Sequence, residues 1–262
     1  MPDAAPELIA RTFEFRPRSA AFTRSSGGAI VCAMSDHVRD LASVREATDR
    51  LLSAVGTLDN AAVAESSRLP GWTRGHVLAH LARNADAIGN VLSGLPMYAS
   101  AEARDADIER DAPRDLREQL EDLRTSATGL ERRAATVDDW TRTVELRNGV
   151  KDSADRIPFR RWIEVELHHV DLGIGYELED LPPEFVTREI DFLAERFAGH
   201  PDMPSTGLKS DDGRVWTTGG GTGTGPVGVA GSPAELLGWL CGRRDGSALT
   251  VEGGPLPVVP PL

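Results

Sequence analysis

The sequence predicts an α+β fold, with an N-terminal four-helix bundle followed by a small C-terminal α+β domain. Between residues 38 and 172, apolar side chains recur every three or four positions in four separate segments, which is the period of a helix with one buried face. After Tyr176 the composition shifts toward proline, glycine and threonine, and short extended segments alternate with helical ones. We therefore expect a disordered extension at residues 1–33, the bundle at residues 34–178 and the second domain at residues 179–262.

Helix-end signals bound the four segments, which we place near residues 35–58, 73–95, 112–130 and 159–172. Ser35 and Thr73 are N-cap residues, because their side chains can accept a hydrogen bond from the first helical turn. Pro70 and Gly71 separate the first two helices, and Gly173 ends the last one.

The second domain has its own helix and strand signals. We expect helices at residues 183–197 and 236–241, and extended segments within residues 207–217, 227–230 and 248–251. Ser232 and Glu235 form a capping box, and Pro233 occupies the first helical position between them.

Three connections carry turn or loop signals. The charged residues 94–111 are expected to form a loop, and residues 140–158 an irregular or briefly extended segment with a turn at Asn148-Gly149. The glycine run at residues 219–225 lacks the Gly-Lys-Ser/Thr ending of a phosphate-binding loop. It is therefore expected to be the tip of a hairpin.

Charge, hydropathy and cysteine content exclude several classes of function. The chain has 29 basic and 41 acidic residues, a net charge of −12, and no basic patch, which argues against a nucleic-acid partner. No stretch approaches the roughly 18 consecutive apolar residues of a membrane span. Cys32 and Cys241 form neither a disulfide framework nor a C-x-x-C redox site. We expect a cytoplasmic monomer.

Four of the six histidines fall on two of the expected helices: His76, His80, His168 and His169. Because successive residues of a helix are about 100° apart, His80 lies closer to the apolar stripe of its helix than His76 does. We therefore expect the His80 side chain to point into the bundle.

The last helix of the bundle offers two pairings of a glutamate with a histidine. Glu164 and His168 are four residues apart and share a face with Asp171, whereas Glu166 and His169 are three apart, and the apolar pattern does not choose between them. Two histidines and one carboxylate with an open fourth position suit a catalytic Zn²⁺. Asp171 could then orient the His168 ring. The alternative is a polar helix face that carries ordinary histidines.

Four segments resemble motifs of one family: LPGWTRGHVLAHLARN at 69–84, PMYASAEAR at 96–104, EVELHHVDLG at 164–173 and GWLCGRRDG at 238–246. The chain is similar to the mycothiol-dependent maleylpyruvate isomerases, which have a DinB-like metal-binding four-helix bundle. The likeness runs from about residue 34 to the end of the chain, and both domains appear in the same order.

The resemblance implies a set of site residues, with Zn²⁺ held by His80, Glu164 and His168. It places the catalytic cation at Arg243, which Arg244 directly follows, and pocket residues that contact the cofactor at Met97 and Tyr98. His76, Glu166 and His169 would then be structural or would support the ligands.

The implied reaction is the conversion of maleylpyruvate, a small dicarboxylate, into fumarylpyruvate in gentisate-type degradation of aromatic compounds. A zinc-activated thiolate would add to the cis double bond, and rotation and release of the thiolate would follow. Neither Cys32 nor Cys241 is near the expected ligands in sequence, so a thiol cofactor is expected. The resemblance implies that this cofactor is mycothiol. The alternatives are a mycothiol-dependent S-transferase of the same fold and a non-catalytic zinc-binding bundle.

Overall fold

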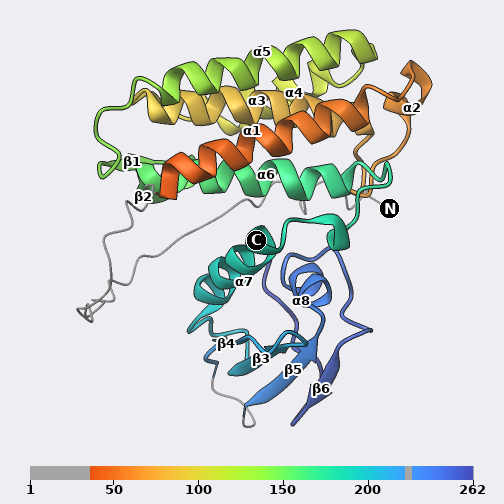
Figure 1. The fold of residues 1–262 in the computed structure, drawn as a ribbon, viewed down its shortest axis with the longest axis vertical. Coiled ribbons are helices and arrows are strands. Elements are labelled where there is room, and N and C mark those ends of the chain that lie inside the picture. Colours follow the sequence, from red (N-terminus) through yellow and green to blue (C-terminus); the bar gives the residue numbers. More distant parts are fainter. Residues whose placement is uncertain (1–35, 222–225, 262) are drawn as a thin grey trace. The chain divides into compact units, whose positions relative to one another are not determined.

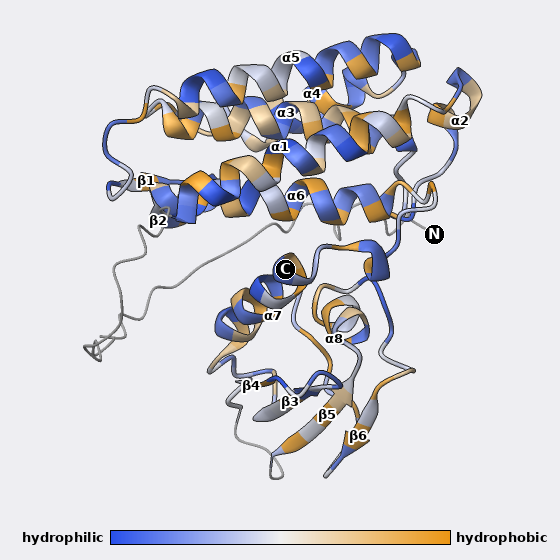
Figure 2. Ribbon diagram, viewed as in Figure 1, coloured by the Kyte–Doolittle hydropathy of each residue, from blue (hydrophilic) through white to orange (hydrophobic). Residues whose placement is uncertain are grey.

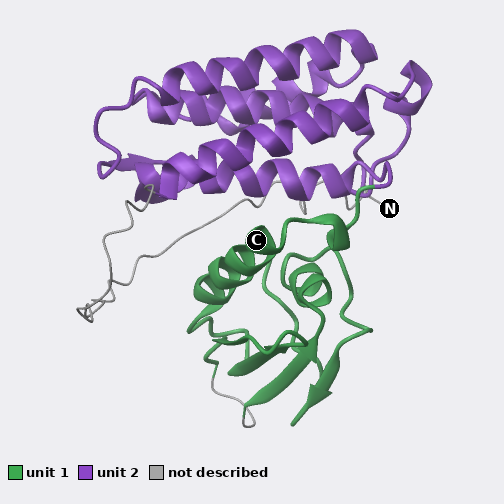
Figure 3. Cartoon of the chain, viewed as in Figure 1, with its two compact units in different colours: residues 1–12, 176–262 green, residues 13–175 purple. Residues whose placement is uncertain are grey.

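The computed structural model describes residues 36–221 and 226–261 (Figure 1). It divides the chain into two compact units, and the boundary lies between Gly175 and Tyr176 (Figure 3). The first unit is helical and the second contains a small sheet, which confirms the predicted fold class. The expected N-cap Ser35, Cys32 and the extension at residues 1–33 lie outside the described residues.

The first unit contains the four expected helices: α1 (Asp36–Val55), α3 (Arg74–Leu92), α5 (Leu116–Ala134) and α6 (Ile157–Asp171). Helix α3 packs against both α5 and α6, and most of its residues are buried. Polar and apolar residues are interspersed along each of these helices, as expected for amphipathic helices around a shared core (Figure 2). The described helices include none with the length and apolarity needed to cross a membrane.

The start of α3 follows from its first residues. The Thr73 side chain accepts from the backbone N–H of His76, and His76 Nδ1 accepts from the backbone N–H of Thr73, so the predicted cap is confirmed. A Cβ on Gly75 would lie 2.2 Å from the carbonyl oxygen of Ala112. Because Gly75 has no side chain, the backbone at Ala112 can lie directly against the start of α3.

Two short helices of this unit were not expected: α2 (Asn60–Ala64) and α4 (Ala101–Asp111). The prediction of a loop over residues 94–111 was wrong for most of that segment. Ser100 caps α4 by accepting from Ala103 N, and the buried residues are Arg104, Ile108 and Asp111. Their spacing is helical, but two of the three are charged, so the apolar periodicity is missing from the sequence.

A short hairpin connects α5 to α6. Strand β1 (Thr143–Glu145) pairs antiparallel with β2 (Lys151–Ser153). Asn148 and Gly149 have φ angles of 61° and 73°, the left-handed region that asparagine and glycine adopt most readily. The briefly extended segment and its Asn-Gly turn are therefore confirmed.

The second unit has two helices, α7 (Pro183–Phe197) and α8 (Pro233–Leu240), and four strands: β3 (Thr206–Ser210), β4 (Val215–Thr218), β5 (Val227–Gly231) and β6 (Thr250–Glu252). The strand order is β4-β3-β5-β6, in which β3 and β5 are parallel and the other pairs are antiparallel. The two helices pack against each other, and their buried apolar faces form the core of the unit with Leu208 and Val229 of the sheet.

The glycine run of this unit is not a hairpin tip. It connects β4 to β5, which are not neighbours, because β3 lies between them. Gly220 and Gly221 donate to the carbonyl oxygen of Met203, and a Cβ on Gly219 would lie 1.9 Å from the carbonyl oxygen of Pro204. These glycines therefore allow one backbone segment to lie directly against another; residues 222–225 lie outside the described part of the chain.

Candidate metal site

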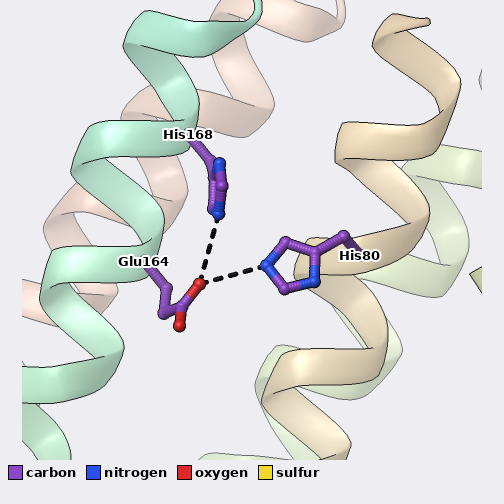
Figure 4. Close-up of side chains that lie close together, drawn as sticks. All are labelled: His80, Glu164 and His168. Atoms are coloured by element: carbon purple, nitrogen blue, oxygen red, sulfur yellow. Dashed lines mark hydrogen bonds and ion pairs between the residues drawn. The ribbon is translucent and has the colours of Figure 1, made fainter. Parts of the chain in front are cut away.

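Two histidines and one glutamate meet in the interior of the first unit (Figure 4). His80 Nε2 lies 3.0 Å from Glu164 Oε2, and His168 Nε2 lies 3.3 Å from the same oxygen. One ligand atom from each residue lies within 4.8 Å of the other two. The two rings point at the carboxylate from different helices, as the close-up shows.

Helix α3 provides one ligand and α6 provides two. His80 is only 4% exposed, so the prediction that it points into the bundle is confirmed. Glu164 and His168 are one helical turn apart and face His80 together. Of the two pairings that the apolar pattern left open, the structure therefore brings Glu164 and His168 together with His80.

Neighbouring side chains contact both imidazole rings on the side away from Glu164. Asp171 Oδ2 lies 2.8 Å from His168 Nδ1, and this carboxylate is buried. A nitrogen of Arg104 lies 3.3 Å from His80 Nδ1, and the ring of Trp72 packs on the His80 ring with 5.6 Å between centroids. An acceptor on the outer nitrogen, such as Asp171 for His168, fixes the orientation of a ring whose inner nitrogen faces the cluster.

The pKa values of the three groups follow from burial and from their mutual contacts. Burial lowers the pKa of His80 to about 4, which keeps its imidazole neutral. Burial acts to raise the pKa of Glu164, but hydrogen bonds with His168 and His80 outweigh it and hold that pKa well below its ordinary value. The cluster therefore offers an ionised carboxylate beside a neutral imidazole.

The pKa of the second histidine moves the other way. Burial acts to lower the pKa of His168, but its hydrogen bonds to Asp171 and Glu164 outweigh burial and raise it. These contacts favour the charged ring, and a metal must displace its proton to use the nitrogen as a ligand.

The donor set fits a zinc ion. Imidazole nitrogens and a carboxylate oxygen are usual Zn²⁺ ligands, and three protein ligands are the number found at catalytic sites that keep one position open. A buried carboxylate behind a ligating histidine is also typical of zinc sites. We conclude that His80, Glu164 and His168 can hold a divalent metal.

The other histidines and glutamate of the two motifs have structural contacts. His76 completes the cap of α3, and its Nε2 lies 3.4 Å from Glu109. Glu166 is buried and accepts hydrogen bonds from Arg50 and from the indole N–H of Trp162. His169 is buried and is not one of the three residues of the cluster.

The two residues expected to contact the cofactor lie in different surroundings. The ring of Tyr98 lies beneath the guanidinium of Arg104, with 5.9 Å from the guanidinium carbon to the ring centroid. Burial raises the pKa of Tyr98, which keeps its hydroxyl protonated. Met97 is partly buried and packs against an apolar cluster that includes Ile88 and Leu92.

The two arginines at the end of α8 also differ in their contacts. Arg244 donates to both carboxylate oxygens of Glu179, at 2.7 and 2.8 Å, and to Glu235 at 2.6 Å. Ser232 accepts from the backbone N–H of Glu235, which is half of the predicted capping box. Arg243 donates to the backbone carbonyl of Cys241 at 2.8 Å.

Two buried arginines near the cluster were missed in the sequence. Arg104 lies in the segment expected to be a loop. Arg161 is fully buried on α6, donates to Leu81 O and Asn84 Oδ1, and has a pKa lowered by burial to about 10. Arg161 lies three residues before Glu164 and therefore shares a helix face with the expected ligands. This spacing could have indicated its position in the sequence.

Family models match nearly the whole described chain. The model described as the mycothiol maleylpyruvate isomerase N-terminal domain matches residues 44–173, and that of the MDMPI C-terminal domain matches residues 180–261. The chain belongs to the mycothiol-dependent maleylpyruvate isomerase family. Both matching ranges agree with the order of units in the structure.

Solved structures of this family have the same fold. A crystal structure of the mycothiol-dependent maleylpyruvate isomerase is 25% identical, with a TM-score of 0.77 over 86% of this chain and 96% of that one. The structure of a histidine-to-alanine mutant of such an isomerase is 24% identical, with the same TM-score and coverage. No curated protein sequence matches the chain.

Removal of the Asp171 carboxylate tests how the cluster is supported. We expect Asp171→Asn to weaken zinc binding by about 10-fold and Asp171→Ala by up to about 100-fold, because the His168 ring loses its acceptor. Zinc affinity is measured by competition with a chromophoric chelator. The matched control is Glu109→Gln, since Glu109 contacts the outer histidine His76. Equal affinities in all four proteins would contradict a supporting role of Asp171.

Proposed function

We propose that the protein is a mycothiol-dependent isomerase that converts maleylpyruvate into fumarylpyruvate. The observation that carries this proposal is the cluster of His80, Glu164 and His168, in a chain whose two halves both match the models of this family. The solved relatives are named for the same activity.

His80, Glu164 and His168 would hold Zn²⁺ in this proposal, and Asp171 would orient His168. When bound, the metal would lower the pKa of the thiol, and the resulting thiolate could add reversibly to the cis double bond. The bond would then be single and free to rotate. The contribution of this chain is to fix the ligands in a site largely removed from water, with His80 buried and the side chains of Glu164 and His168 each 14% exposed. Electrostatic interactions are stronger there than in water.

Cys241, the cysteine among the described residues, does not suit the role of the reacting thiol. Cys241 is buried, and its Sγ lies 3.7 Å from the carbonyl oxygen of Gly238 in its own helix. Such a cysteine is inert, because burial in apolar surroundings disfavours the thiolate. This supports a small thiol as cofactor, which the family name identifies as mycothiol. We assign contact with it to Tyr98 and Met97.

We assign the catalytic cation to Arg243. Arg244 is held by two carboxylates, those of Glu179 and Glu235, and this ion-pair cluster links the parts of its own unit. Arg243 donates instead to a carbonyl oxygen of the turn that follows α8. Arg243 also stands in the segment GWLCGRRDG at 238–246, which resembles the family motif that carries the catalytic cation. Its guanidinium could bind a substrate carboxylate or the negative charge that develops during the reaction.

The fate of the thiol distinguishes an isomerase from an S-transferase of the same fold. With maleylpyruvate in excess over mycothiol, an isomerase makes many products per thiol and the free thiol is recovered in full. A transferase consumes one thiol per product. We expect full recovery of the thiol, measured by thiol titration beside ultraviolet detection of fumarylpyruvate. Consumption of thiol in proportion to product would show that the chain is a transferase.

A further inference from the structure

We infer that Arg104 and Tyr98 form a carboxylate-binding subsite beside the metal ligands. The identity of the carboxylate as a substrate group rests on the proposed function, but the anion-binding site itself rests on the contacts of Arg104. It would be a second cation for the substrate, carried by the same unit as the metal ligands.

The first observation is the burial of the Arg104 charge. Its side chain is 5% exposed, on the inward face of α4. Among the described residues, its carboxylate partner is Asp105, whose side chain is 54% exposed. Because water screens an exposed carboxylate, that ion pair compensates the buried cation only in part.

The second observation is where the guanidinium points. One of its nitrogens lies 3.3 Å from His80 Nδ1, and the guanidinium carbon lies over the ring of Tyr98. Arg104 is thus in direct contact with a ligand of the candidate metal site. A group bound to the nitrogen that contacts His80 would lie beside the metal ligands.

The third observation concerns the hydrogen-bond roles of the His80 ring. A neutral imidazole has one N–H, so Nδ1 can accept from Arg104 only while Nε2 donates to Glu164. When His80 Nε2 gives its lone pair to a metal, the proton of the neutral ring lies on Nδ1. The Nδ1–H then faces the N–H of Arg104, which is also a donor. The Arg104 nitrogen then needs a new acceptor.

A carboxylate is the acceptor that fits best. The guanidinium is a planar fork of donors that binds carboxylates through two parallel hydrogen bonds. The chain has a net charge of −12, so capture of a dicarboxylate depends on local cations. The ring face of Tyr98 supports the guanidinium through a cation–π contact.

The test measures binding of maleate, a cis-dicarboxylate, to the zinc-loaded full chain by isothermal titration calorimetry. We expect Arg104→Gln to weaken maleate binding at least tenfold with zinc content unchanged, and Arg104→Lys to weaken it less. The matched control is Arg110→Gln, an exposed arginine of the same helix, which should bind maleate as the parent does. Zinc is measured by mass spectrometry and folding by thermal melting.

Unchanged maleate affinity in a folded, zinc-loaded Arg104→Gln protein would overturn the subsite, and so would a parent protein that binds no maleate. If Arg104→Gln fails to fold, Arg104→Lys decides, since it keeps the charge and loses the fork; parental affinity in that variant overturns the subsite. A parent that binds maleate through Arg104 but does not convert maleylpyruvate would support the subsite and refute the proposed function.

Discussion

Replacement of His80 by alanine is expected to remove zinc and isomerase turnover together. His80 is the ligand that α3 contributes, and without it the two ligands of α6 remain, which are too few for a stable site. We expect zinc affinity to fall by more than about 100-fold, beyond the loss typical of supporting residues. Turnover should fall to the uncatalysed rate. Zinc content and the ultraviolet assay of fumarylpyruvate measure the two effects.

The control for this variant is His76→Ala, one turn earlier on the same helix. His76 caps α3, so its loss should cost about 1 kcal/mol of stability and leave zinc content unchanged. A His80→Ala protein that keeps zinc and turnover would show that the three-residue cluster is not the metal site.

Replacement of Arg243 by alanine is expected to leave zinc in place and to lower turnover by about 100-fold or more, the loss typical of a group that stabilises developing negative charge. Arg244→Ala should behave differently. It removes the contacts to Glu179 and Glu235, which we expect to cost about 1 kcal/mol of stability because these carboxylates are partly exposed. Its turnover per folded molecule should match the parent.

Zinc content, thermal melting and initial rates separate these two arginine variants. An inactive Arg244→Ala beside a fully active Arg243→Ala would reverse the assignment of the catalytic cation. Loss of zinc in Arg243→Ala would instead show that its effect on turnover is indirect.

The sequence was sufficient for the bundle helices, because each combines an apolar stripe with clear end signals. Thr73 caps α3 as expected, and His80 lies inside the bundle as its position on the stripe predicts. The apolar periodicity could not show which of Glu164 and Glu166 is the metal ligand. Helix α6 is buried on nearly all sides, so its inner face has no apolar signature, and Glu166 is as buried as a ligand would be.

Two predictions were wrong because they depend on tertiary structure. Helix α4 was missed because Arg104 and Asp111 occupy buried positions where apolar residues mark most helices. The charge of Asp111 is compensated in part from another helix, by Arg83 of α3. The link from β4 to β5 was misread as a hairpin, because strand order depends on pairing with β3 and not on local turn residues.

The most direct test of the account is maleylpyruvate conversion by the zinc-loaded protein with and without mycothiol, repeated after the metal is removed by a chelator. The account predicts conversion only when zinc and thiol are both present, and recovery of activity when zinc is restored. Conversion without thiol, or by the chelated protein at the same rate, would contradict it. Zinc binding without conversion in any condition would indicate a zinc-binding bundle of another function.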